Sequence, residues 1–112
     1  MGVRIGNLVA SSGIAGRDPA TGELPPDPAR QAEFMFQNVR TLLEAGGVSP
    51  ADVARMTVYV KDNAYRDHVN REWLKMFPDE DDRPARHTLV YDLQGGMLVQ
   101  CELLAVAETD AG

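Results

Sequence analysis

The feature that most constrains the fold is a strand-like run near the carboxyl end, residues 97–107. Its odd-numbered positions are Met97, Val99, Cys101, Leu103 and Ala105, and its even-numbered positions are Leu98, Gln100, Glu102, Leu104 and Val106. Successive side chains of a strand point to opposite faces, so a strand that is largely apolar on both faces must be covered on both sides. Helices of the same chain can cover one side. A second copy of the same sheet, in a closed symmetric oligomer, is the simplest cover for the other.

Two segments have the periodicity and the end signals of helices. The first begins at Asp27 and Pro28, an N-cap followed by a first-turn proline, and ends at Gly46-Gly47. The second covers residues 64–77 and stops at Pro78, because the residue before a proline disfavours helical backbone. Its apolar stripe consists of Tyr65, Val69, Trp73 and Phe77.

The remaining apolar segments are predicted to form strands. Residues 3–14 have the pattern of a β-hairpin that turns at Gly6-Asn7, and residues 56–60 that of a single β-branched strand. Residues 86–93 are expected to pair with the last strand in a second hairpin, through the turn Gln94-Gly95-Gly96. The proline-rich residues 15–27 and the turn at residues 49–52 connect these elements.

The order β-hairpin, α, β, α, β-hairpin predicts an α+β fold for a single domain over residues 1–112. Its two helices are expected on one face of a mixed, mainly antiparallel sheet. The other face is then left for a subunit interface.

Composition excludes several functional classes. The chain carries 17 Asp and Glu against 11 Lys and Arg, a net charge of −6, so neither nucleic acid nor an anionic membrane attracts it in general. Cys101 is the only cysteine, which excludes an intrachain disulfide, and with two histidines the chain lacks the familiar zinc spacings. No apolar run reaches the length of a signal-peptide core. We therefore expect a cytoplasmic domain with no membrane segment and no metal.

The most suggestive single residue is Arg86, which Pro84-Ala85 places at the start of an otherwise apolar strand. Its planar guanidinium is suited to recognising a carboxylate. Alternatively, Arg86 is a solvated side chain that pairs with the acidic residues 79–82.

Gln100 and Glu102 lie two residues apart on the last strand, so both side chains point to the same side of the sheet. In one interpretation, Gln100 and Glu102 line a ligand pocket together with Arg86. In the other, Glu102 forms an ion pair with an arginine across a subunit contact.

The end of the first hairpin, Ser11-Ser12-Gly13, offers a second candidate. The glycine allows a ligand to approach the backbone closely, although the same residues also suit an ordinary turn. Neither serine lies in a GxSxG elbow, and neither has a His or Asp at an activating spacing. The sequence therefore gives no support to a serine nucleophile.

Several segments together resemble the RidA/YjgF family, also called L-PSP endoribonuclease-like proteins. They are IGNLVASSG at 5–13, DPATGELP at 18–25, QNVRTLLEAGG at 37–47, MTVYVKD at 56–62, VNREW at 69–73, RPARHT at 83–88 and QCELLAVA at 100–107. They cover nearly the whole chain in the family's order. The resemblance implies the chorismate-mutase-like α+β fold and a homotrimer with a barrel-like core and a cleft at each subunit interface.

The resemblance also implies an activity. Active members hydrolyse reactive 2-imino and 2-enamino acids to 2-keto acids and ammonia, without a metal or an organic cofactor. The family's carboxylate-binding arginine falls on Arg86, its strand-end serine and glycine fall on Ser12 and Gly13, and its helix asparagine falls on Asn70.

Other positions depart from the family's pattern. Gln100 stands where active members carry the glutamate that activates water, and an amide can orient a water but cannot take its proton. Glu102 is an alternative base, one pleat repeat of about 6.6 Å further along the strand. Thr88 stands where many active members have a cysteine. In active members a segment before the first strand also brings a tyrosine to the cleft, and we expect the cleft of this protein to lack that tyrosine.

Three functional hypotheses follow. The first is a RidA-like deaminase of altered specificity or weakened activity, in which Arg86 binds the carboxylate, Asn70 and the Gly13 backbone orient the substrate, and Gln100 or Glu102 positions water. The second is a non-catalytic homotrimer that binds small carboxylates. The third is an endoribonuclease, which the acidic charge balance and the lack of a histidine pair disfavour.

Overall fold

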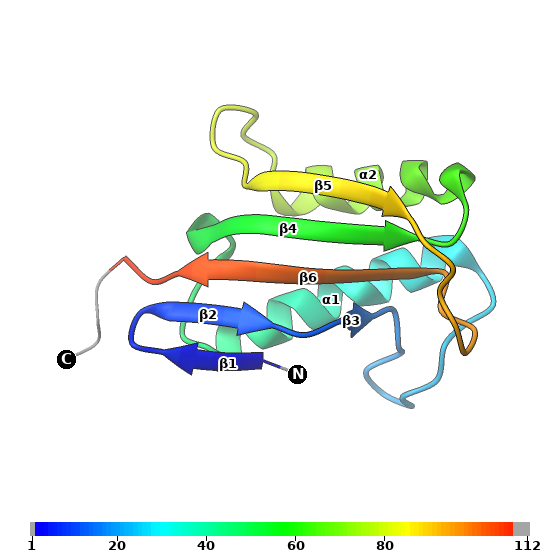
Figure 1. Ribbon diagram of the computed structural model, residues 1–112, viewed down its shortest axis with the longest axis horizontal. Coiled ribbons are helices and arrows are strands. Elements are labelled where there is room, and N and C mark those ends of the chain that lie inside the picture. Colours follow the sequence, from blue (N-terminus) through cyan, green and yellow to red (C-terminus); the bar gives the residue numbers. More distant parts are fainter. Residues whose placement is uncertain (1, 109–112) are drawn as a thin grey trace.

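A computed structural model describes residues 2–108 as two helices packed on one face of a six-stranded sheet (Figure 1). The helices are α1 (Pro28–Ala45) and α2 (Arg66–Met76), and short 3-10 turns at Pro50–Asp52 and Asn63–Tyr65 precede β4 and α2. The strands are β1 (Gly2–Ile5), β2 (Leu8–Ser11), β3 (Ile14–Ala15), β4 (Val53–Val60), β5 (Ala85–Val90) and β6 (Val99–Val106). The predicted α+β class, with both helices on one face of a mixed sheet, is confirmed.

Helix α1 begins at the capping residue that the sequence predicts, whereas a capped 3-10 turn precedes α2. The Asp27 carboxylate accepts a hydrogen bond from the Ala29 backbone N–H at 3.0 Å, and α1 ends where Gly47 adopts a φ of 72°, a left-handed conformation that favours glycine. At the second helix, Asp62 caps the 3-10 turn by accepting from the Ala64 N–H at 2.8 Å. The regular helix α2 therefore starts two residues later than predicted.

The strand order is β1-β2-β6-β4-β5, with β3 pairing further along β6. The predicted first hairpin is confirmed: β1 and β2 pair antiparallel around Gly6, whose φ is 60°. Strands β4 and β5 are parallel and joined through α2, a βαβ unit that leaves β5 as an outer strand of the sheet. β6 pairs antiparallel with β4, β2 and β3.

The predicted second hairpin is wrong, because β4 lies between β5 and β6. A local turn does form, with the Met97 N–H donating to the Gln94 carbonyl at 3.3 Å. Turn residues, however, specify only a local change of direction. The partner of β5 is set by the crossover helix, which returns the chain parallel to β4. Strand β5 also ends at Val90, three residues earlier than predicted.

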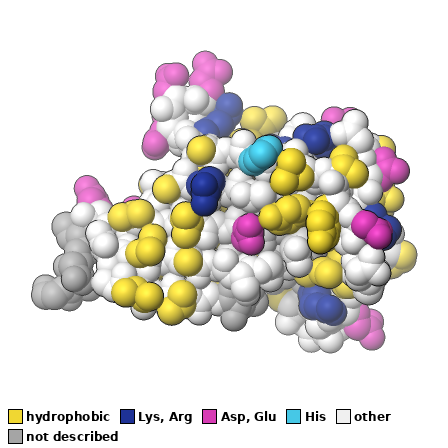
Figure 2. Space-filling view, in the orientation of Figure 1, with side chains coloured by type: hydrophobic (Ala, Val, Ile, Leu, Met, Phe, Trp, Pro, Cys, Tyr) yellow, Lys and Arg dark blue, Asp and Glu magenta, His cyan; other side chains and the backbone are white. Residues whose placement is uncertain are grey.

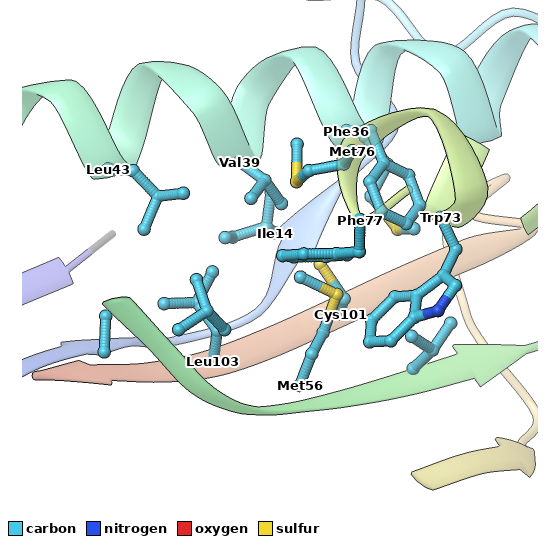
Figure 3. Packing of buried hydrophobic residues seen from close by; sticks show 14 of the residues in the cluster. Ile14, Phe36, Val39, Leu43, Met56, Trp73, Met76, Phe77, Cys101 and Leu103 are labelled. Atoms are coloured by element: carbon cyan, nitrogen blue, oxygen red, sulfur yellow. The ribbon is translucent and has the colours of Figure 1, made fainter. Parts of the chain in front are cut away.

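The helix-facing side of the sheet forms the core. Figure 3 shows side chains of α1 and α2 meeting those of β4 and β6 in one continuous layer. The strand residues buried in it are Val9, Ile14, Val53, Met56, Val58, Val60, Val99, Cys101, Leu103 and Ala105, and the helix residues include Met35, Phe36, Val39, Leu43, Val69, Trp73 and Met76. The odd-numbered face of β6 is therefore covered as expected. Neither helix within residues 2–108 is long and apolar enough to cross a bilayer.

The opposite face of the sheet is open, and no helix within the described residues covers it, since α1 and α2 both lie behind the sheet in Figure 1. Apolar side chains gather on this face over β1, β2 and the end of β6 (Figure 2), where Ile5 is 70% exposed and Val106 is 43% exposed. The even-numbered residues of β6, among them Gln100 and Glu102, lie on this same face. Both faces of β6 are thus apolar in large part, and only one is buried within the chain.

Gln31 of α1 is a fully buried polar side chain that the sequence pattern did not single out. Its Nε2 donates to the carbonyls of Pro25 and Gly96 at 2.7 and 3.0 Å, and its Oε1 accepts from the Leu98 N–H at 2.8 Å. One amide therefore joins two loops to the helix and fixes where the chain enters β6.

We expect the substitution Gln31→Leu to lower the free energy of unfolding by about 3 kcal/mol, because three partly buried backbone groups lose the hydrogen-bond partner that the Gln31 amide provides. Urea denaturation of the purified variant measures the change. The matched control is Gln37→Leu at an exposed position of α1, expected to alter stability by about 0.5 kcal/mol or less. Equal losses in the two variants would contradict the role assigned to Gln31.

Candidate functional site

Arg86 is the second residue of β5, and its register with Met56 turns its side chain toward α2. Its Nε donates to the Thr88 hydroxyl at 2.8 Å, and its Nη2 donates to the Asn70 Oδ1 at 2.6 Å. The guanidinium carbon lies 5.1 Å from the centre of the Trp73 ring. Two hydrogen bonds and one aromatic face therefore hold the guanidinium in a single orientation.

The charge of Arg86 has no carboxylate partner among residues 2–108. The alternative in which it pairs with the acidic residues 79–82 is therefore wrong; instead Arg83 of that loop donates to the Phe77 carbonyl at 2.8 Å. Partial burial, and then the neighbouring charge of Arg66, lower the pKa of Arg86, but an arginine remains cationic at neutral pH. A fixed cation without a counterion is suited to an anionic ligand.

The residues that orient Arg86 reach it from two elements. Asn70 lies on α2 four residues after Arg66 and three before Trp73, so the three side chains share one face of the helix. Thr88 is two residues after Arg86 on β5 and therefore shares its face of the sheet. Asn70, Thr88 and Arg86, which the resemblance assigned to one site, are thus close together. We call Arg66, Asn70, Trp73, Arg86 and Thr88 the arginine group.

A second group surrounds the interruption between β2 and β3. Between the residues of β2 and β3 that pair with β6, the three residues 11–13 lie opposite only the two residues 102–103 of β6. The chain therefore bulges at Ser12-Gly13, where Ser12 is exposed. A Cβ on Gly13 would stand only 2.5 Å from the Gln100 Nε2, so glycine is what lets the amide occupy this place. The same Nε2 lies 3.7 Å from the Met97 sulfur. Ser12, Gly13 and Gln100 are therefore neighbours, and we call them the glutamine group.

Glu102 is exposed on the open face, further along β6 from Gln100. It accepts a hydrogen bond from the Tyr59 hydroxyl at 3.1 Å, and this bond raises the pKa of Tyr59. Together with Arg55 and Thr57 it lines a hollow of about 190 Å³. Glu102 is thus engaged with β4, and no ion pair with an arginine forms within the described residues.

The two groups lie on opposite sides of the sheet. Arg86 faces α2, whereas Gln100 and Glu102 face the open side, and β4 separates their strands by about two interstrand spacings, roughly 10 Å. Within a single chain, therefore, these residues do not line one pocket, and their predicted common pocket at a subunit interface stays a prediction. A shared pocket requires the arginine group of one chain and the glutamine group of another.

Sequence reasoning did not identify Arg66 or Trp73 as members of the arginine group. The available signal was helical spacing, because residues four before and three after Asn70 must point the same way as Asn70. The sequence pattern places Trp73 in the apolar stripe of the helix and indicates no second role for it. It serves both purposes, since it is buried and also presents its ring to Arg86.

The remaining reactive side chains do not join either group. Burial raises the pKa of the Cys101 thiol, which removes the thiolate needed of a nucleophile. His87 pairs with Thr57 in the sheet register and faces the open side, whereas His68 is on α2, across the sheet. Among residues 2–108 no three His, Cys, Asp or Glu side chains are placed to hold a metal ion.

Comparison with known proteins gives consistent matches. The family model described as Endoribonuclease L-PSP matches residues 1–107. A 2-iminobutanoate/2-iminopropanoate deaminase of Escherichia coli K12 is 35% identical over 107 residues, 94% of this chain and 84% of the relative. A RutC family protein of Haemophilus influenzae is 40% identical over 86 residues, 75% of this chain but 66% of that relative. The structure of E. coli TdcF with bound serine superposes with a TM-score of 0.86 at 29% identity, over 96% of this chain and 86% of TdcF.

Proposed function

The chain belongs to the endoribonuclease L-PSP family, the RidA/YjgF family that its sequence resembles, and from this membership we propose that it is a hydrolytic deaminase of small 2-imino and 2-enamino carboxylic acids. The observation that carries the proposal is the Arg86 guanidinium, which Thr88 and Asn70 orient and which no carboxylate of the described chain neutralises. The name of the E. coli relative, a deaminase of two small imino acids, supports the same substrate class.

The proposed site is completed by assembly. The uncovered, partly apolar face of the sheet and the separation of the two groups support a chorismate-mutase-like homotrimer with a barrel-like core. In this assembly the arginine group of one subunit faces the glutamine group of its neighbour. The free, buried thiol of Cys101 suits a reducing cytoplasmic setting.

The reaction needs only groups that the two halves supply. Arg86 binds the substrate carboxylate, and the carbon bearing the imine then lies near Gln100 of the neighbouring subunit. Water adds its oxygen to that carbon, and one of its protons goes to the imine nitrogen to give a carbinolamine. The hydroxyl proton of the carbinolamine then moves to the amino nitrogen, and the C–N bond breaks as the C=O bond forms, which gives the 2-keto acid and ammonia. Gln100 orients the water but cannot take its proton, so the basic substrate nitrogen accepts it. The hydrolysis involves no oxidation or reduction, so it requires no redox cofactor.

One observation favours a second candidate function. The residue packed against Gly13 is an amide rather than a carboxylate, so the site has an anion-binding half without an evident general base. A homotrimer that binds small carboxylates without turning them over is consistent with this arrangement. Nuclease activity has less support, because His68 and His87 lie on different sides of the sheet and cannot act as an acid–base pair.

An assay with an imine generated in situ distinguishes these functions. An amino-acid oxidase produces 2-iminobutanoate, and release of 2-oxobutanoate is followed with and without the purified protein. Acceleration above the spontaneous rate supports the deaminase, and binding of 2-oxobutanoate without acceleration supports the carboxylate-binding protein. Cleavage of single-stranded RNA that persists unchanged after a second purification would support the nuclease instead.

We expect light scattering of the purified protein to give a mass about three times the 12.2 kDa of the chain. The physical reason is the apolar open face, which a monomer leaves in water. The measurement is repeated over a range of protein concentrations. A mass that stays at one chain throughout would contradict the proposed interface.

A further inference from the structure

Arg66 and Arg86 both donate to Thr88. The Arg66 Nη2 donates to the Thr88 carbonyl oxygen at 3.1 Å, and the Arg86 Nε donates to the hydroxyl of the same residue at 2.8 Å. Arg66 is also held through its Nε, which donates to the Asn63 Oδ1. Two guanidinium groups are therefore fixed side by side at the outer strand of the sheet, each by two hydrogen bonds.

Neither guanidinium is neutralised within the part of the chain that the structure describes. The ion pairs there join Arg30 to Glu33, Lys61 to Asp92 and Lys75 to Glu72. Both arginines use Nε and Nη2 in their hydrogen bonds, and no group among residues 2–108 accepts a hydrogen bond from either Nη1. Each group can therefore offer the end formed by its two terminal nitrogens to a ligand.

Arg66 and Arg86 are both partly buried, and their like charges repel each other. A neutral hydrogen-bond donor could equally serve the Thr88 carbonyl, so this contact alone does not account for a second positive charge beside Arg86. The repulsion is relieved when anionic groups bind to both. A monocarboxylate neutralises one guanidinium only. A ligand with two carboxylates neutralises both, and each carboxylate matches the planar fork of one arginine.

We propose that Arg66 is a specificity-determining residue that binds a second carboxylate, so that the preferred substrates are 2-imino acids with an acidic side chain. Arg86 binds the carboxylate next to the imine carbon, and Arg66 binds the carboxylate at the end of the side chain. This assignment rests on the proposed deaminase function for the substrate's chemistry, but the ligand-binding preference that it predicts is independent of turnover.

The test measures binding of two stable keto acids, 2-oxoglutarate and 2-oxobutanoate, to the purified full chain by titration calorimetry. The wild-type protein is expected to bind the dicarboxylate about tenfold or more tightly than the monocarboxylate. In Arg66→Gln this ratio is expected to fall to about one, and Arg66→Lys, which keeps the charge without the fork, should retain a ratio of a few-fold. Arg40→Gln on the exposed side of α1 makes the same charge change elsewhere and should keep the wild-type ratio.

A wild-type ratio near one overturns the inference, and so does an unchanged ratio in Arg66→Gln. If Arg66→Gln does not fold, a ratio in Arg66→Lys equal to that of the wild type overturns it as well. Turnover of 2-iminobutanoate is measured separately on the wild-type protein. Dicarboxylate preference without turnover contradicts the proposed deaminase alone, whereas turnover without dicarboxylate preference contradicts this inference alone.

Discussion

Replacement of Arg86 by alanine is expected to lower kcat/KM for imine hydrolysis by about a hundredfold or more. The variant loses a fixed guanidinium that donates two charge-assisted hydrogen bonds to the substrate carboxylate, and about 3 kcal/mol of lost interaction corresponds to a factor of about one hundred. The measurement is the rate of keto-acid release from an imine formed in situ.

The fold should tolerate Arg86→Ala. Its hydrogen-bond partner Asn70 is exposed and can bond to water instead, so thermal unfolding of the variant should resemble that of the wild type. Arg86→Lys keeps the positive charge but loses the planar guanidinium that donates two parallel hydrogen bonds to a carboxylate. Its kcat/KM should therefore lie between that of the wild-type protein and that of Arg86→Ala. Full activity in Arg86→Ala would remove the basis of the proposed function.

The second large effect is expected from Gln100→Glu, which places a carboxylate against Gly13 without a change in side-chain size. A carboxylate can take the proton of the attacking water, and general-base catalysis is typically worth about 10²- to 10⁴-fold. We therefore expect kcat/KM to rise by a factor in this range. Steady-state kinetics with the same imine substrate provides the comparison with the wild-type protein.

The pH dependence identifies the origin of such a gain. A general base acts only when it is deprotonated, so kcat/KM of Gln100→Glu should fall as the pH drops through the pKa of the new carboxyl, while the wild-type amide produces no such limb. Gln94→Glu, in the exposed turn before β6, makes the same chemical change away from the site and should not raise the rate. A rate for Gln100→Glu no higher than that of the wild type would show that a missing base does not limit the reaction.

Local signals in the sequence were sufficient for the helices and the first hairpin. Asp27 and Pro28 determine the start of α1 through backbone chemistry within a few residues, and Gly6-Asn7 supplies the turn between β1 and β2. The exposed even-numbered face of β6 followed from simple alternation. Each of these features depends on neighbours in the chain, which is why the pattern alone was informative.

Features that depend on strand partners could not be obtained in this way. The position of β4 between β5 and β6 is set by the crossover of α2, and it is this register that puts Arg86 and Gln100 on opposite faces. Gln31 could not be recognised either, since its partners at Pro25, Gly96 and Leu98 are defined only by the packing of two loops on α1. The sequence therefore identifies Arg86, Asn70, Gly13 and Gln100 as candidate site residues, but it does not show that they divide into an arginine group and a glutamine group on opposite faces of the sheet.

That division has a genetic consequence. In the proposed ring of three subunits, a chain inactivated at Arg86 still offers an intact Gly13–Gln100 half, and a chain inactivated at that half still offers Arg86. Co-expression of two such alleles, each inactive alone, should restore function by intragenic complementation, with random mixing rebuilding about a quarter of the sites.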